Sequence, residues 1–157
     1  MKNLIIILLS FISFNAFAAA TSSKSDVSSE RAKQINDLYE VAEKRIYNNE
    51  YDKALKLLIN LAKNDDLGEK KADIYNLLGF SYRKSSNPDL DKSYNAYMTA
   101  LEYDPKHAGA HEYLGELYMM RGETEKAMNM LDKLENLVGK NANEYKDLLK
   151  AIKSYQS

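Results

Sequence analysis

The letters LLGFSY at residues 77–82 return as YLGELY at residues 113–118, 36 positions later along the chain. Aligning the two stretches places Gly79 on Gly115 and Tyr82 on Tyr118, which gives the shared pattern Leu-Gly-x-x-Tyr. A motif that recurs at a period in the mid-thirties indicates a chain built from repeated helical hairpins. Chains of this kind bury one continuous core between stacked copies and present extended binding surfaces.

The residues that follow each glycine keep a common register. In three places small and large residues are spaced four and then three apart, at Ala54, Leu58 and Leu61, at Ser93, Tyr97 and Ala100, and at Ala127, Leu131 and Leu134. With the two Leu-Gly-x-x-Tyr motifs, this spacing resembles the tetratricopeptide repeat family, whose unit is a helical pair of about 34 residues. The resemblance implies an all-α fold, a right-handed α-solenoid of about three hairpins at roughly 35–68, 72–107 and 108–141.

The last segment, about 141–155, predicts a capping helix. Gly139 is suited to end the preceding helix, and an apolar stripe then recurs at helical spacing, at Tyr145, Leu148, Leu149 and Ile152. A solenoid needs a terminal element with a polar outer face. The alternative is an amphipathic helix that binds a membrane or a partner.

The N-terminus has the pattern of a secretory signal peptide. Lys2 precedes an apolar run from Leu4 to Phe17, and a small-x-small sequence ends at Ala18. We therefore expect a signal peptide at 1–20, a flexible Ser-rich leader at 21–31 and the repeat domain at 32–155. An exported protein is predicted, with the periplasm as its location. The alternative is a scaffold tethered to the membrane by an uncleaved leader.

The composition excludes several classes of partner. The chain has 22 Lys and Arg against 23 Asp and Glu, so it lacks the basic excess that nucleic-acid binding requires. It has no Cys, which excludes disulfides and a lipid-modified N-terminal Cys. We expect no nucleic-acid partner and no stable membrane insertion after signal cleavage. The oligomeric state is left open by the sequence.

No motif in the sequence predicts catalysis. The chain has no Cys nucleophile, no glycine-rich phosphate loop and no Ser near a His in a triad order. The protein is therefore expected not to be an enzyme and to carry no cofactor and no metal. The alternative rests on His107 and His111, which share one helical face and could hold a metal or small ligand with Glu112 or Glu116.

The family resemblance also implies where a partner binds. In this family the first helices of successive repeats line a concave groove, and the positions that face it carry over to Tyr39, Glu43, Asn76, Phe80, Arg83, Glu112, Glu116 and Met119. The basic residues with which some members clamp a C-terminal carboxylate are missing. The inferred groove is acidic at both ends and aromatic in the middle, which suits an amphipathic or partly basic peptide.

Three hypotheses for function follow from the sequence. The first is a non-catalytic protein–protein interaction module of the bacterial cell envelope that binds a partner protein or peptide in the concave groove. The second is an exported protein that binds a metal or small ligand through His107 and His111. The third is the membrane-tethered scaffold.

Overall fold

The computed structural model describes residues 12–64 and 67–156. These residues form seven α-helices and one short 3-10 helix, with no strand among them. The helices are α1 (Ile12–Tyr47), α2 (Tyr51–Leu61), α3 (Lys71–Lys84), α4 (Leu90–Tyr103), α5 (Ala108–Met120), α6 (Thr124–Val138) and α7 (Asn143–Gln156), and η1 (Gly68–Lys70) precedes α3. The all-α fold that the sequence predicts is confirmed.

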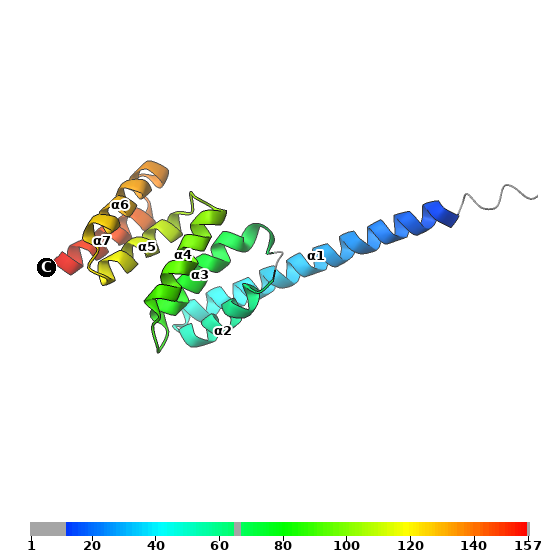
Figure 1. The fold of residues 1–157 in the computed structure, drawn as a ribbon, viewed down its shortest axis with the longest axis horizontal. Coiled ribbons are helices and arrows are strands. Elements are labelled where there is room, and N and C mark those ends of the chain that lie inside the picture. The colour runs from blue at the N-terminus through cyan, green and yellow to red at the C-terminus, as the bar shows by residue number, and fades with distance from the viewer. Residues whose placement is uncertain (1–11, 65–66, 157) are drawn as a thin grey trace, which may run out of the picture.

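The helices form a stack of hairpins. The pairs α1–α2, α3–α4 and α5–α6 pack together, and α2–α3 and α4–α5 contacts join each pair to the next (Figure 1). The last helix, α7, packs on both α5 and α6 and closes the C-terminal end of the stack. Its buried face carries Tyr145, Leu148 and Ile152. This packing is what the predicted cap requires.

Each helix end has a local cause. Gly122 and Gly139 adopt positive φ angles of 74° and 79° after α5 and α6, a backbone region that glycine enters without a steric penalty. Asp89 caps α4 by accepting a hydrogen bond from the Lys92 backbone N–H at 2.9 Å. The longer connection before α4 is held by Ser85, whose hydroxyl donates to the carbonyl oxygens of Tyr82 and Asn87.

The buried apolar residues form two core clusters. The first lies between α1, α2 and α3 and reaches α4 at Ala96, with Ala42, Leu58 and Ile74 completely buried. The second extends from α4 to α7 and has Leu117 and Leu134 at its centre. Each cluster includes residues from more than one hairpin, so the stack is stabilised by contacts between neighbouring hairpins.

The structure differs from the sequence prediction in residues 21–31. These residues, predicted as a flexible leader, form part of the helix α1. The N-terminal half of α1 extends away from the packed helices (Figure 1). No Gly or Pro interrupts residues 12–47, so local propensity alone permits the helix. Residues 26–34 are all exposed, and Ile35 is the first residue of α1 that enters the core. The leader is therefore helical here, and its residues 26–31 lie outside the core.

The predicted signal peptide at 1–20 lies partly outside the described residues, which begin at Ile12. Among the helices that the structure describes, none is both long enough and apolar enough to cross a membrane. The processing of this segment stays a prediction.

Candidate functional site

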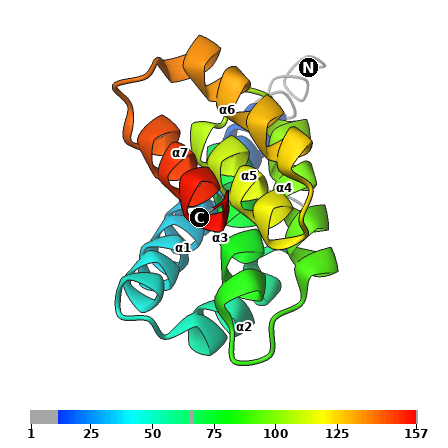
Figure 2. The same cartoon turned by 90° about the vertical axis from the view of Figure 1, so that its left-hand side faces the viewer.

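The first helices of the hairpins lie side by side. α1 contacts α3, α3 contacts α5, and α5 contacts α7, although a second helix separates the members of each pair in the sequence. Figure 2 shows α1 and α7 on one side of the stack and α4 on the other. The face formed by α1, α3, α5 and α7 is therefore the one on which the sequence analysis placed its candidate residues.

The structure gives those candidates unequal exposure. Glu43 is exposed, and Phe80 and Glu116 are partly exposed. The other five are buried, namely Tyr39, Asn76, Arg83, Glu112 and Met119. Met119 belongs to the C-terminal core cluster, and Tyr39 belongs to the N-terminal one, where the Lys70 ammonium lies 4.6 Å from the centre of its ring. The exposed part of the predicted groove is therefore centred on α3 and α5.

An ion pair joins α3 to α5 in that region. Arg83 Nη2 lies 2.5 Å from Glu116 Oε2, with the Arg83 side chain almost wholly buried. The Arg83 guanidinium also stands over two rings, 5.4 Å from the centre of Phe80 and 5.8 Å from that of Tyr113. A buried guanidinium held by a carboxylate and two rings fixes the relative position of two successive hairpins.

A row of aromatic rings crosses three helices beside this ion pair. The Phe80 ring centre lies 5.9 Å from that of Tyr51 on α2 and 4.8 Å from that of Tyr113 on α5. Such edge-on and tilted ring pairs are favourable beyond the apolar area they bury. Phe80 belongs to neither core cluster and keeps part of its surface exposed. It is thus an aromatic residue that the fold holds in place without enclosing.

Glu112 is the most unusual charged residue of the site. It is only 8% exposed, and its carboxyl makes no hydrogen bond or ion pair with any residue that the structure describes. Burial raises the pKa of the Glu112 carboxyl to about 8, and the negative charges of Glu116, Asp147 and Glu144 add to this rise, against the opposing effect of Arg83. Near neutral pH this carboxyl is largely protonated.

The two histidines do not form a common site. His107 caps α5: its Nδ1 accepts a hydrogen bond from the Ala110 backbone N–H at 3.0 Å, and its Nε2 lies 3.1 Å from Asp73 Oδ1. His111 Nε2 donates to the Pro105 carbonyl oxygen at 2.9 Å. The described residues contain no cluster of three or more His, Cys, Asp or Glu placed to hold a metal ion. A metal bound by both histidines would have to displace a present contact of His107, because both of its ring nitrogens are engaged.

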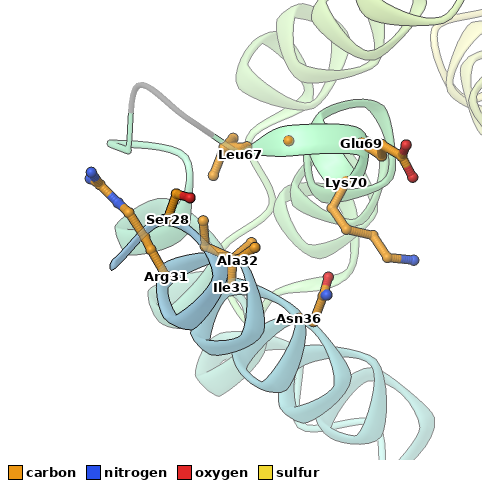
Figure 3. A pocket seen from close by; sticks show the side chains of 9 residues that line it. Ser28, Arg31, Ala32, Ile35, Asn36, Leu67, Glu69 and Lys70 are labelled. Carbon is orange, nitrogen blue, oxygen red and sulfur yellow. The ribbon is translucent and has the colours of Figure 1, made fainter. Parts of the chain in front are cut away.

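Sequence reasoning missed two residues of the site and one pocket. Tyr51 and Tyr113 complete the aromatic row, and the only available signal was that each occupies a repeat position next to a recognised motif residue. A pocket of about 340 Å³ lies between α1 and the η1 segment (Figure 3). Ala32, Ile35 and Leu67 line it, and none of the predicted groove residues does. Its two walls come from distant segments, so no local motif marks it.

The comparison with protein families finds a match in the second half of the chain. The family model for the tetratricopeptide repeat matches residues 87–152, which contain α4, α5, α6 and most of α7. The match covers less than half of the chain. The resemblance that the sequence analysis drew from its motifs is thereby confirmed. No curated protein matches the sequence.

Solved structures share the fold over most of the chain. The Yersinia enterocolitica type III secretion chaperone SycD, in complex with a peptide of the translocator YopD, is 20% identical, covers 79% of this chain and 90% of its own, and has a TM-score of 0.63. PcrH, in complex with the chaperone-binding region of PopB, is 14% identical, with 78% and 94% covered and a TM-score of 0.61.

MamA is 16% identical and matches 98% of this chain and 95% of its own, with a TM-score of 0.58. At these identities the comparison establishes a shared fold. The shared fold includes part of the chain before residue 87, where the family model does not match.

Proposed function

We propose that this protein is a non-catalytic interaction scaffold that binds a segment of a partner protein on the face formed by α1, α3, α5 and α7. The observation that carries the proposal is Phe80. Its ring is partly exposed, is held between the rings of Tyr51 and Tyr113, and lies under the Arg83 guanidinium. An aromatic side chain fixed in this way beside a buried polar pair has the character of an interface anchor.

The comparisons support the class of partner. Two solved proteins with this fold, SycD and PcrH, were each determined with a segment of another protein bound. The match covers more than three quarters of this chain in both cases. A peptide or protein segment is thus the natural ligand to test here. YopD is the partner named for SycD, and PopB is the one named for PcrH.

We further propose that the protein is exported and acts in the cell envelope. The support is the signal-peptide pattern of residues 1–20, in which Lys2 leads an apolar run that ends near Ala18. Mass spectrometry of the protein from its natural source is expected to find an N-terminus between Ala18 and Thr21. An intact Met1 in the membrane fraction would instead support the tethered scaffold.

The groove is tested by removing the Phe80 ring. Peptides that bind the wild-type protein are first selected from a random display library, and their affinities are then measured by calorimetry. Truncating a central aromatic anchor costs at least about 2 kcal/mol, which is roughly a thirtyfold loss of affinity. We expect Phe80→Ala to show such a loss, with its helical dichroism unchanged.

The matched control is Tyr103→Ala. Tyr103 is an aromatic residue about half exposed on α4, which is not one of the helices of the proposed face, and its ring lies beside Tyr75 and Lys71. Its truncation is expected to leave the peptide affinities within about twofold of the wild type, in the range of energetically neutral surface positions. Equal affinities for wild type and Phe80→Ala across all selected peptides would contradict the proposed binding face.

A further inference from the structure

Two hydrogen-bond acceptors on the proposed binding face have no donor among the described residues. Glu112 on α5 is 8% exposed, and its carboxyl oxygens are not among the wholly buried atoms, so they can be reached from outside. The Asn76 carbonyl oxygen Oδ1 on α3 is also without a partner among the described residues, and Asn76 is 6% exposed. Native proteins satisfy nearly all such buried groups, and each exception calls for an explanation.

The two acceptors belong to one place. Asn76 Nδ2 would lie 3.1 Å from a Cβ added at Gly109, so the Asn76 amide touches the turn of α5 that precedes Glu112. Residues three apart on a helix are neighbours on one face. Asn76 and Glu112 also occupy the same position in successive copies of the repeat, 36 residues apart. The Asn76 amide therefore lies beside the helical turn that begins at Gly109 and carries Glu112.

The charges around Glu112 favour a cation. The charged and titratable groups that face it are Glu116 and Tyr113 from α5, Glu144 and Asp147 from α7, and Arg83 from α3. Arg83, the one cation of this set, already binds Glu116 and places its Nη1 3.9 Å from the Met120 sulfur. The surroundings of Glu112 thus contain three other carboxylates and one cation.

We propose that Glu112 and Asn76 receive the ammonium or guanidinium group of a Lys or Arg side chain carried by the bound partner segment. This inference rests on the proposed function, because it assigns a ligand group to the same face. A positively charged donor satisfies both acceptors at once and offsets the excess of carboxylates. A charge-assisted hydrogen bond of this kind is about twice as strong as a neutral one.

The proposal predicts that binding releases a proton. In the free protein the Glu112 carboxyl is largely protonated at neutral pH, since its pKa is about 8. A cation beside the carboxyl favours its charged form and lowers this pKa. Capture of the basic side chain near neutral pH is therefore coupled to the loss of close to one proton, and affinity rises as the pH is raised toward the pKa of Glu112.

The test uses peptides selected from a random library on the wild-type protein at about pH 8. A Lys or Arg is expected at a recurrent position in the selected sequences. Replacing that Lys with norleucine, or that Arg with citrulline, is expected to weaken binding to the wild type by at least about tenfold. The same replacement should have little effect on Glu112→Gln, so that the double-mutant cycle shows coupling between the two groups.

Calorimetry in two buffers of different ionisation enthalpy measures the proton. Near neutral pH the wild type is expected to release close to one proton on binding, and Glu112→Gln none. The matched control is Glu125→Gln, because Glu125 is an exposed glutamate on α6. This control variant should bind and release the proton as the wild type does. Unchanged helical dichroism of the Gln variants verifies that each is folded.

The outcomes separate this inference from the proposed function. If Phe80→Ala loses the peptides but the replacement of Lys or Arg costs the same in wild type and Glu112→Gln, the groove stands and the cation site is wrong. Selected peptides without a recurrent basic residue lead to the same conclusion. If neither Phe80 nor Glu112 affects any selected peptide, or if none can be selected, both proposals are overturned.

Discussion

The hairpins α3–α4 and α5–α6 carry the same Leu-Gly-x-x-Tyr motif, yet they use its glycine differently. A Cβ at Gly79 would lie 2.6 Å from a ring carbon of Tyr97, which belongs to the second helix of the same hairpin. A Cβ at Gly115 would lie 2.5 Å from a methyl carbon of Leu148, which belongs to α7. Gly79 therefore allows the two helices of one hairpin to approach closely, whereas Gly115 allows α7 to pack closely on α5.

The size of one residue in the second helix accounts for the difference. In α4 the repeat position is Tyr97, whose fully buried ring reaches across to Gly79. In α6 the same position is Leu131, which is shorter, and the space over Gly115 is filled from α7 instead. The repeat motif therefore specifies a close approach at the glycine, while the neighbouring sequence decides which helix makes it.

The two hairpins also differ on the proposed binding face. At matching positions α3 has Asn76, Phe80 and Arg83, whereas α5 has Glu112, Glu116 and Met119. Arg83 of one hairpin pairs with Glu116 of the next, so the difference in charge holds the two together. Glu112 is left without such a partner among the described residues. The binding face is thus built from unlike repeats, and the ion pair joins two different repeat positions, since Glu116 aligns with Phe80 and Arg83 with Met119.

The largest predicted effect distinguishes the two glycines. Gly79→Ala places a methyl group against the rigid, fully buried Tyr97 ring, and overpacking of this kind costs up to about 3 kcal/mol. At Gly115 the obstacle is the end of a Leu side chain, which can change rotamer, and the gain of about 1 kcal/mol from replacing a helical Gly offsets much of the cost. Denaturant unfolding is expected to show a clear loss for Gly79→Ala and a change near zero for Gly115→Ala.

A larger side chain makes the test at Gly115 stricter. Gly115→Leu cannot be accommodated by a rotamer change of Leu148 alone and is expected to force α7 away from α5, at a cost of about 1–3 kcal/mol. A greater loss for Gly115→Ala than for Gly79→Ala would reverse the comparison. It would mean that the contact between α5 and α7 is more rigid than the contact between α3 and α4.

The second prediction concerns the two glutamates of α5. The folded-state pKa of Glu112 is raised to about 8 from its usual 4.5, so the contribution of its protonated form to stability is fully present below about pH 4.5 and is lost as the pH rises through 8. Glu112→Gln keeps the neutral shape at every pH. At about pH 9 it is expected to be more stable than the wild type, because the wild type must then hold a charged carboxylate in a place that favours the neutral acid.

Glu116→Gln is the contrasting variant. It removes the charge that Arg83 binds and leaves a buried guanidinium without its carboxylate, which is destabilising. Denaturant unfolding at about pH 9 should therefore show opposite signs for two Glu→Gln changes one helical turn apart. A loss of stability for both variants would mean that the Glu112 carboxyl has a partner in the folded protein.

The repeat register could be predicted from the sequence because it depends on local spacing. Leu78, Gly79 and Tyr82 mark the first helix of a hairpin, and Pro105 marks the end of its second helix. The structure places α3 and α4 at Lys71–Lys84 and Leu90–Tyr103, in accord with this pattern. A periodicity of small and large residues decides which side of a helix is buried, and it does so without knowledge of the rest of the molecule.

The burial of the candidate residues could not be predicted in the same way. A repeat position predicts on which face of its helix Asn76 or Glu112 lies. How deeply the side chain is buried depends on how closely the first helix of the following hairpin, or α7, approaches that face. That distance is decided by contacts such as Gly109 against Asn76 and Gly115 against Leu148. The helical state of residues 21–31 escapes prediction for the opposite reason, because a Ser-rich composition favours a flexible chain while the absence of Gly and Pro leaves the helix free to continue.

The smallest predicted effect concerns His111, which replaces the Tyr75 of the preceding hairpin. Its Nε2 donates to the Pro105 carbonyl oxygen, and its Nδ1 is buried without a partner among the described residues. Burial lowers the pKa of His111, against the effect of the Pro105 carbonyl, so the ring contributes stability above its usual pKa near 6.5 that is lost as the pH falls. His111→Gln lacks a group that titrates there. On acidification the His111 ring takes a proton on Nδ1, which then becomes a buried donor without a partner, and such a donor costs about 1–3 kcal/mol. The wild type is therefore expected to lose stability relative to His111→Gln, by up to about 1 kcal/mol.

Thermal unfolding between about pH 5 and pH 8 measures this difference, and a difference that is constant over the range would contradict the prediction. The control is His107→Asn, which removes the other imidazole of the chain and keeps a residue suited to the N-cap. The same measurement with zinc or nickel tests the metal-site hypothesis. A melting temperature raised by metal in the wild type but not in His111→Gln would show that the His111 ring binds the metal.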